Sequence, residues 1–354
     1  MTPQRTGHQP VFCTVVPPHV LDKLAQADDA ARAELARRTL ELDAAQRTRR
    51  RITTLRAAVP GPAAPSDQPD RRVHDAQRRE VLPGRKVRGE TDPATRDATV
   101  NRAHAGLGAT FDLYLKVYGR HSIDDAGLPL IATVHYGREY SNAFWNGEQM
   151  VFGDGDGDLF LDFTLPVDVI GHELTHGVVQ YTANLEYYGQ SGALNESVAD
   201  VFGVLIKQYG LGQRAADADW LIGAGLLGPD VQGVALRSMK APGTAYDDDV
   251  LGRDPQPATM DDYVRTNQDN GGVHINSGIP NHAFYLFATE LGGNAWERAG
   301  QVWYDTLSGG ELAPDADFSE FARLTLSAAS ARYGEGDVLE AVTKAWSSVG
   351  VPTN

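Results

Sequence analysis

The stretch HELTHGVVQYTANLEYYGQSGALNESVADVFG, residues 172–203, contains two histidines and several carboxylates at the spacing of a metal site. His172 and His176 are four residues apart, so in a helix both side chains project from one face and can bind one ion. Glu173 is one step around the helix, close enough to reach a water molecule on that ion. Because HExxH is short enough to occur by chance, the prediction of a metal site requires a third ligand.

Glu196 is the candidate for that third ligand. A catalytic zinc ion takes three protein ligands and keeps one position open. Glu196 follows His176 by twenty residues, in a segment expected to form the next helix, and Asp200 lies one turn further on the same face. A metal-bound histidine usually donates its other ring N–H to an acceptor, and Asp200 is placed to accept it from His172. Taken alone, Glu196 could equally be an exposed helix carboxylate, but its spacing from HELTH favours a ligand.

The pattern of apolar residues divides the rest of the chain into parts. Residues 22–58 predict one helix, rich in Ala, Leu, Arg and Glu, and residues 59–70, with four prolines, predict a linker. Strands are predicted at LIATVHY (130–136), QMVFG (149–153) and LFLDFTL (159–165), with one helix near 98–118. From Pro166 onward the spacing is helical, in segments 166–183, 191–210, 283–293, 295–310, 317–334 and 336–350.

The stretch 172–203 resembles the zinc-binding helices of the thermolysin family of endopeptidases. SNAFWNGEQMVFGDGDG (141–157) resembles the substrate-binding strand of that family, and DNGGVHINSGIPN (269–281) resembles its second catalytic motif. The three motifs occur in the family's order, and the likeness covers roughly residues 75–354. It implies an α+β, two-lobed metalloprotease with the zinc helix between the lobes. The expected parts are a mainly helical prosegment (1–52), a linker and start of the mature chain (53–74), a β-rich lobe that includes the zinc helix (75–185) and a helical lobe (186–354).

The resemblance implies a ligand set for one catalytic Zn²⁺ ion. His172, His176 and Glu196 would bind the ion. Asp200 and Asn195 would lie behind these ligands and orient them.

The resemblance also implies the catalytic groups. Glu173 would be the general base that takes a proton from the zinc-bound water and passes it to the leaving amine. Tyr187 and His274 would stabilise the oxyanion, with Asp269 orienting His274. Tyr188 is adjacent to Tyr187, and the count from HELTH favours Tyr187. The glycines around residues 271–272 predict a tight loop that presents His274.

Substrate binding is implied by the same resemblance. Asn142 and Ala143 would lie on an edge strand that binds a peptide as an added strand, and Arg237 would bind a substrate carbonyl. The pocket for the residue after the scissile bond would be lined by Phe160, Phe163, Val169 and Leu236. An apolar pocket predicts cleavage on the amino side of bulky hydrophobic residues. Each of these four residues could also be ordinary core.

One departure from the family concerns calcium. Long-chain members bind a pair of calcium ions near the end of the second zinc helix, and here the matching positions are Lys207, Leu221 and Ala224. Asp168 and Asp219 remain, but a lysine removes the negative charge that a double Ca²⁺ site requires, so we expect this site to be lost. GDGDGD (153–158) fits an EF-hand poorly and predicts a turn.

The front of the chain resembles the protealysin branch, whose members have a short prosegment with a Pro-Pro element. VFCTVVPPHVL (11–21) contains Pro17, Pro18 and the chain's single cysteine, Cys13. Pro17 and Pro18 are expected to enter the cleft as an inhibitor, because they lack backbone donors and have fixed φ. Three interpretations of Cys13 are open: a fourth zinc ligand, a small buried hydrophobe, or an exposed thiol. We expect packing, with the prolines rather than Cys13 reaching the cleft.

Charge and composition limit the partners. Residues 1–100 have a net charge of +5 and residues 101–354 a net charge of −20, which argues against nucleic acid and suggests that the basic front docks on the acidic body. The expected partners are peptide or protein substrates and the chain's own prosegment, with room for a dedicated protein inhibitor. No disulfide, membrane span or standard secretory signal is predicted, so the chain is expected to be cytoplasmic as synthesised, with release by a non-standard route left open.

Two other functions compete with an endopeptidase. An aminopeptidase with the same zinc ligands would need a carboxylate motif that captures a free amine, and none is visible beside the zinc helix. A binding protein with a vestigial site would have lost Glu173 or His274, and both are present.

Overall fold

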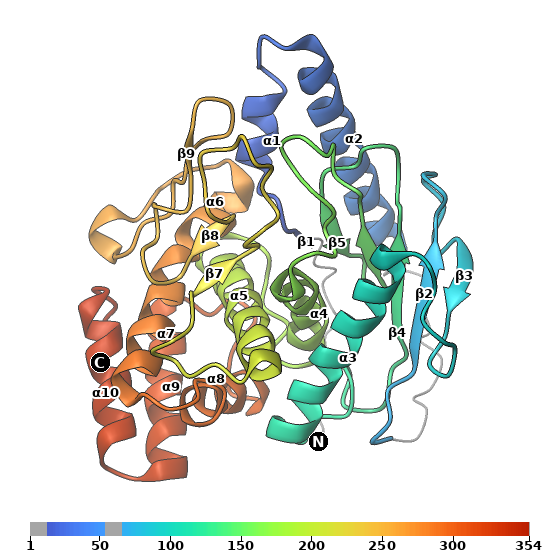
Figure 1. Cartoon of the computed structure of the whole chain (residues 1–354). Helices are drawn as coiled ribbons and strands as arrows, with labels where there is room; N and C mark the ends of the chain where they lie inside the picture. The colour runs from blue at the N-terminus through green and yellow to red at the C-terminus, as the bar shows by residue number, and fades with distance from the viewer. Residues whose placement is uncertain (1–12, 54–65, 354) are drawn as a thin grey trace.

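The computed structural model describes residues 13–53 and 66–353. Two helices of the front segment, α1 and α2, lie at the top of Figure 1, above a strand-rich part on one side and a helical part on the other. The helices are α1 (Pro18–Leu24), α2 (Ala30–Thr53), α3 (Ala98–Tyr118), α4 (Val167–Tyr181), α5 (Gly189–Leu211), α6 (Asp269–Asn276), α7 (Gly278–Leu291), α8 (Arg298–Ser308), α9 (Phe318–Tyr333) and α10 (Asp337–Ser348).

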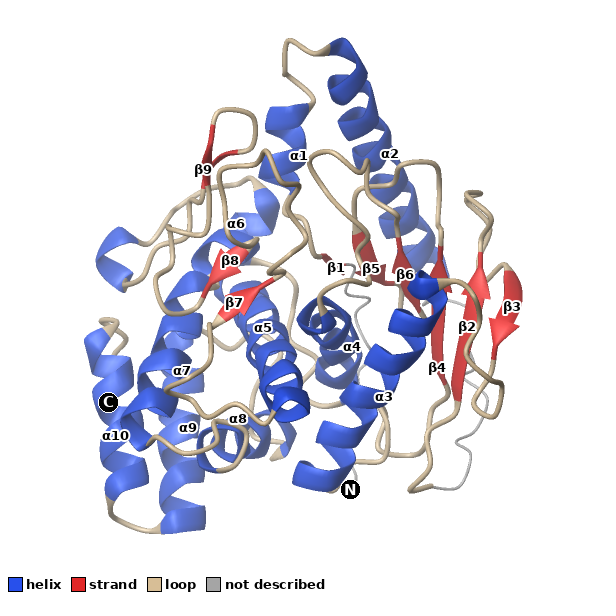
Figure 2. Ribbon diagram, in the orientation of Figure 1, coloured by secondary structure: helices blue, strands red, loops and turns tan. Residues whose placement is uncertain are grey.

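The main sheet has six strands in the order β1-β5-β6-β4-β2-β3 (Figure 2). Its strands are β1 (Cys13–Thr14), β2 (Arg71–Asp75), β3 (Arg85–Arg88), β4 (Leu130–Val134), β5 (Ala143–Trp145) and β6 (Met150–Phe152). The central β4 pairs in parallel with β2 and β6, while the outer pairs are antiparallel. β1 belongs to the front segment, so this segment covers what would otherwise be the free edge of β5.

Helices α4 and α5 form the buried centre of the molecule. From Asp168 to Val179, every residue of α4 is buried. Two glycines let the helices approach closely: a Cβ on Gly203 would lie 2.6 Å from the Asp168 carbonyl oxygen, and one on Gly171 would lie 2.5 Å from Ile206 Cδ1. The metal-site residues are therefore held on two rigid, closely packed helices.

The helical part is packed through aromatic residues of α7–α10. Trp303 of α8 stacks on Trp346 of α10 with ring centroids 5.8 Å apart and nearly parallel rings, and Phe284 and Phe287 of α7 pack against Trp303. Four short strands, β7 (Leu221–Ile222), β8 (Arg237–Ser238), β9 (Asp247–Asp248) and β10 (Gly252–Arg253), form two small hairpin-like sheets.

Two sequence-based expectations about elements were wrong. The segment 22–58 is two helices where it is described, because the side chain of Asp29 accepts hydrogen bonds from the N–H groups of Ala31 and Arg32 and starts α2 anew. The segment 159–165 is not a strand: Phe160 makes one isolated bridge to Leu227, and turns follow. Within the described ranges, no helix is both long enough and apolar enough to span a bilayer.

Candidate active site

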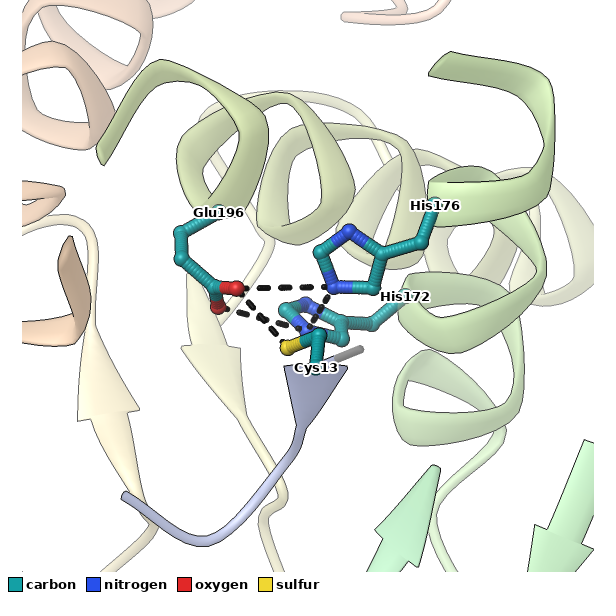
Figure 3. Close-up of side chains that lie close together, drawn as sticks. All are labelled: Cys13, His172, His176 and Glu196. Atoms are coloured by element: carbon teal, nitrogen blue, oxygen red, sulfur yellow. Dashed lines mark hydrogen bonds and ion pairs between the residues drawn. The ribbon is translucent and has the colours of Figure 1, made fainter. Parts of the chain in front are cut away.

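The two histidines of α4 point their Nε2 atoms at each other across 3.1 Å (Figure 3). Their Nδ1 atoms form hydrogen bonds with other residues: His172 Nδ1 lies 2.7 Å from Asp200 Oδ1, and His176 Nδ1 lies 2.8 Å from Asn195 Oδ1. Because both partners are acceptors, each Nδ1 carries the proton and each Nε2 presents a lone pair. Two lone pairs face to face repel each other unless a cation lies between them.

Glu196 completes the group from α5. Its carboxylate oxygens lie 3.6 Å from His172 Nε2 and His176 Nε2, and Oε2 is buried without a hydrogen-bond partner. Ligands about 2.1 Å from one centre at tetrahedral angles lie roughly 3.4 Å apart, so this set fits a zinc ion. Burial alone would raise the pKa of Glu196, but the neighbouring histidines lower it to about 2, and burial lowers the pKa of His176 to about 4. An ionised carboxylate beside a neutral imidazole is the ligand state that zinc requires.

Glu173 lies beside this group, on the same helix and fully buried. Its Oε2 accepts a hydrogen bond of 2.9 Å from the backbone N–H of Trp145 on β5, while Oε1 has no hydrogen-bond partner among the residues that the structure describes. Burial, and secondarily the charge of Glu196, raises the pKa of Glu173 well above its ordinary value. One anchored oxygen and one free oxygen of raised basicity suit a group that accepts and returns a proton.

His274 and Tyr187 approach from the other side. The Tyr187 hydroxyl hydrogen-bonds Glu196 Oε1 and lies 3.2 Å from His274 Nε2, whereas Tyr188 is largely exposed. Asp269 Oδ1 lies 2.6 Å from His274 Nδ1, and Oδ2 accepts from the His274 backbone N–H. Burial alone would lower the pKa of His274, but Asp269 and Glu196 raise it to about 9, so the ring is a cationic donor near neutral pH.

His274 is presented by a short helix rather than by a free loop. Residues 269–272 have positive φ, with Gly271 at +84° and Gly272 at +80°, and α6 then continues through His274. The left-handed stretch lets the Asp269 carboxylate turn back onto the backbone and ring of His274.

Arg237 and Asn142 lie on opposite sides of the cleft. Arg237 donates to both Asp200 oxygens at 2.8 Å and to the carbonyl of Val15 at 3.1 Å. Asn142 Oδ1 accepts from Val16 N–H at 2.9 Å. Ala143 O accepts from Val15 N–H at 3.1 Å. The three residues predicted to bind the substrate backbone, Asn142, Ala143 and Arg237, therefore all contact the front segment.

The expectation for Cys13 was wrong in one respect. Cys13 is buried, as expected, but it does not merely pack: its Sγ donates to Glu196 Oε1 at 2.8 Å and lies 3.8 Å from His274 Nε2. Sγ and one ligand atom each of His172, His176 and Glu196 all lie within 4.8 Å of one another (Figure 3). Burial, then the charges of Glu196 and Glu173, raises the pKa of the thiol when no cation is bound.

The expectation that the prolines rather than Cys13 would reach the cleft was wrong for Cys13, which lies among His172, His176 and Glu196. Pro17 precedes the first turn of α1 and Pro18 is its first residue, where a missing N–H costs nothing. The β1 strand formed by Cys13 and Thr14 can pair with β5 because both residues keep their backbone donors. The prolines instead turn the chain out of the cleft immediately after Val16.

The predicted pocket residues are all buried in the main hydrophobic cluster, which also contains Val15 and Val16 of the front segment. They are Phe160, Phe163, Val169 and Leu236. Phe160 and Phe163 are in ring contact, with centroids 6.0 Å apart. Their place in this cluster is consistent with a pocket beside Val15, and their role remains a prediction.

Sequence analysis missed several residues that support the site. Asn281 Nδ2 donates to Asp200 Oδ2 at 2.9 Å, and Gln256 Nε2 donates to the His274 carbonyl at 2.8 Å. Asp43 of α2 accepts from Tyr140 and, at 3.1 Å, from Asn142 Nδ2. Asp43 and Ala36 lie on the same buried face of α2. A carboxyl group on the buried face of a helix was the sequence signal that could have identified Asp43.

Lys207 lies between two carboxylates. Its Nζ is 2.9 Å from Asp168 Oδ2 and 2.9 Å from Asp219 Oδ1, and it donates to the Leu221 carbonyl at 2.6 Å. Burial alone would lower the pKa of Lys207, but the two carboxylates raise it. Ala224 offers no ligand atom in its side chain.

Comparison with known proteins agrees with this geometry. The family model described as thermolysin metallopeptidase, catalytic domain, matches residues 66–180, and the thermolysin metallopeptidase alpha-helical domain matches residues 183–351. An extracellular metalloprotease of Pectobacterium carotovorum subsp. carotovorum is 49% identical over 346 residues, covering 96% of both chains. A thermolysin of Bacillus sp. (strain EA1) is 40% identical over 290 residues, covering 79% of this chain and 50% of its own length.

A solved structure is also similar over nearly the whole chain. It is the precursor of protealysin, a metalloproteinase from Serratia proteamaculans, with a TM-score of 0.88 and 48% identity, covering 96% of this chain and 99% of that one.

Proposed function

Because the chain belongs to the thermolysin family of metallopeptidases, we propose that it is a zinc endopeptidase made as a zymogen, which cuts on the amino side of bulky hydrophobic residues. That it is a metalloendopeptidase of the protealysin-like kind follows from the family match and the relatives. The finer proposal rests chiefly on one observation: the Nε2 lone pairs of His172 and His176 converge beside Glu196 and the free oxygen of Glu173.

The metal would be bound by His172, His176 and Glu196. A zinc ion there would supply a Lewis acid that lowers the pKa of water and polarises a carbonyl. Glu173 Oε1 accepts a proton from the attacking water, and the backbone N–H of Trp145 on Oε2 holds the carboxylate in place. Glu173 then delivers that proton to the leaving nitrogen, so one residue acts as base and as acid.

His274 and Tyr187 supply donors to the substrate oxygen that becomes negative. The His274 ring, kept protonated by Asp269, and the Tyr187 hydroxyl lie 3.2 Å apart and both approach Glu196. Donors fixed in a buried site before reaction stabilise developing charge without reorganising.

A substrate would be bound as an extra strand on β5. The support is that β1 already pairs there antiparallel, with Asn142, Ala143 and Arg237 hydrogen-bonded to its continuation. Val15 belongs to the same hydrophobic cluster as the predicted pocket residues, and this is the support for proposing a large hydrophobic residue after the scissile bond.

The zymogen state is proposed to depend on Cys13. A thiolate is a good zinc ligand, and Sγ lies within 4.8 Å of a ligand atom of each of the other three residues, so it would take the fourth position that water would otherwise occupy. The front segment thus competes both for the substrate strand and for the open metal position.

The substitution Glu173→Gln tests the mechanism. It should preserve the fold and bound zinc, because Glu173 is not a metal ligand, and should lower peptidase activity by several orders of magnitude. Zinc content by atomic absorption and turnover of a peptide library on the processed protein are the measurements. Near-normal turnover, or a preference for charged residues after the cut, would contradict the proposal.

A further inference from the structure

The front segment lies in the cleft with the polarity and register of a substrate. Three backbone groups mark the register: Val15 N–H donates to Ala143 O, Val15 O accepts from Arg237, and Val16 N–H donates to Asn142 Oδ1. Arg237 is expected to bind a substrate carbonyl, and here it binds the carbonyl of Val15. When that carbonyl is assigned to the residue after the scissile bond, Val15 occupies that residue's position.

The preceding carbonyl supports the same register independently. Thr14 O lies 3.1 Å from His274 Nε2, the donor proposed to stabilise the oxyanion. Cys13 pairs with Trp145, whose N–H anchors Glu173, and Thr14 pairs with Phe144. The peptide bond between Thr14 and Val15 therefore lies between the oxyanion donor and the substrate-carbonyl donor, beside β5, the strand whose Trp145 N–H anchors the base.

We propose that Thr14–Val15 is a latent scissile bond of this enzyme, kept intact because the Cys13 sulfur occupies the place of the attacking water. The inference rests on the proposed function and adds a second processing site to it. Val15 is a β-branched apolar residue, which is what the pocket is expected to accept.

The hydrolysis is chemically complete with water alone. The water oxygen adds to the Thr14 carbonyl carbon, and Glu173 takes one of its protons. The C–N bond then breaks, the electron pair stays on the Val15 nitrogen, and the proton held by Glu173 completes the new amine. Thr14 becomes a carboxylic acid that retains the second proton of the water and then loses it to solvent to give a carboxylate. Cys13 is thereby separated from Val15, Val16 and α1, and the inhibitory strand loses its connection to the docked helices.

Full-length Cys13→Ala protein tests this inference. Intact-mass analysis and N-terminal sequencing should find a species that begins at Val15, absent from the wild-type precursor, and its first-order rate constant should not change with protein concentration. Adding Glu173→Gln should abolish the species. Cys13→Ala/Val15→Asp should lose this cut, because a charge does not suit the pocket, whereas the matched Cys13→Ala/Val16→Ala variant should keep it.

Hydrogen exchange gives a readout that does not depend on turnover. In full-length Glu173→Gln protein, the Val15 and Val16 amides should be protected from exchange. They should stay protected after Cys13→Ala, because their acceptors are the Ala143 carbonyl on β5 and Asn142 Oδ1. Loss of both protections on Cys13→Ala would overturn the proposal, because the segment would then stay in the cleft only through its sulfur.

The outcomes separate this inference from the proposed function. A Cys13→Ala protein that cuts added peptides or its linker but yields no Val15 terminus, or cuts a different bond in the segment, overturns the register alone. A zinc-loaded protein that cuts no peptide bond at all overturns the proposed function.

Discussion

At the residue scale, single buried charges connect groups that act on different parts of a substrate. Asp200 accepts from His172, from Arg237 and from Asn281, so one carboxylate orients both the proposed metal ligand and the proposed donor to the substrate carbonyl. Burial alone would raise the pKa of Asp200, but Arg237 and His172 lower it well below its ordinary value. A buried charge is tolerated here because every partner is in place.

Lys207 is the second such charge, and we predict that it replaces a metal. Lys207→Met should lower the free energy of unfolding by about 3–5 kcal/mol, because the buried Asp168 carboxylate loses its cation. Denaturant unfolding measures this, and Lys207→Met/Asp168→Asn should recover part of the loss. Added CaCl₂ should leave the melting temperature of the wild-type protein unchanged, and a clear increase would show that a calcium site persists.

At the element scale, helix α2 reaches the substrate strand through one carboxyl group. Asp43 is buried against Tyr140 and Asn142, and the same Asn142 side chain binds Val16 of the front segment. Burial raises the pKa of Asp43 to about 7, despite those two hydrogen bonds and the charge of Arg47. His19 of α1 has the opposite shift, since burial lowers its pKa to about 4.

These two shifts predict opposing effects of pH on docking of the front segment. Asp43 binds its proton more tightly when the front segment is docked. Its stabilisation of docking is therefore complete below its ordinary pKa of about 4 and is lost as the pH rises through 7. His19 binds its proton less tightly when docked, so it opposes docking below about 6.5 and has no effect above. Between about pH 4 and 6.5 the stabilisation of docking by Asp43 and the destabilisation by His19 nearly cancel.

Substituting either residue should reveal the pH dependence of docking that the other one causes. With His19→Gln, docking should weaken by up to roughly tenfold per pH unit between about 4 and 7, and with Asp43→Asn it should strengthen over about 4 to 6.5. The protection of the Val16 amide against hydrogen exchange, in a full-length Glu173→Gln background, measures docking, with an α10 amide as control. An unchanged pH slope in Asp43→Asn would refute the assignment.

At the scale of the whole molecule, the front segment joins both halves of the cleft. β1 extends the sheet, Arg237 and His274 bind its backbone from the helical side, and exposed ion pairs such as Arg32–Asp158 and Arg38–Glu80 add to the contact. Exposed pairs of this kind contribute little each, so the buried strand should dominate the affinity. The expected docking of a basic front on an acidic body is therefore a minor part of the interface.

Maturation is predicted to occur in the chain that joins the front segment to the body. A protease that prefers hydrophobic residues after the cut should cleave before Ile52, Leu55 or Val59 and give a mature N-terminus between residues 50 and 60. Most of that range lies outside the described residues. N-terminal sequencing decides the site, and Glu173→Gln should remain unprocessed unless active enzyme is added. A full-length protein with stable activity would contradict the prediction.

The sequence by itself predicted the candidate metal ligands, which the structure brings together, and the helical elements that carry them. The spacing of His172, His176 and Glu196 is local along two helices, and the bounds of α3, α4 and α5 agree closely with the segments predicted to be helical, so both could be inferred without tertiary contacts. The two-lobed fold could be predicted because the three motifs occur in the same order as in the thermolysin family. The break between α1 and α2 was also local, at Asp29, but a continuous run of good helix formers obscured it.

Only the tertiary structure decided how the front segment meets the site. Whether Cys13 packs or reaches Glu196 depends on a contact between residues 183 positions apart, and no pattern within either segment specifies that distance. Asp43 likewise acquires its role from Asn142 and Tyr140, which lie on another element. Helical periodicity records which face is buried, but not against which atoms, and the placement of a sulfur, a carboxyl group or a scissile bond depends on those atoms.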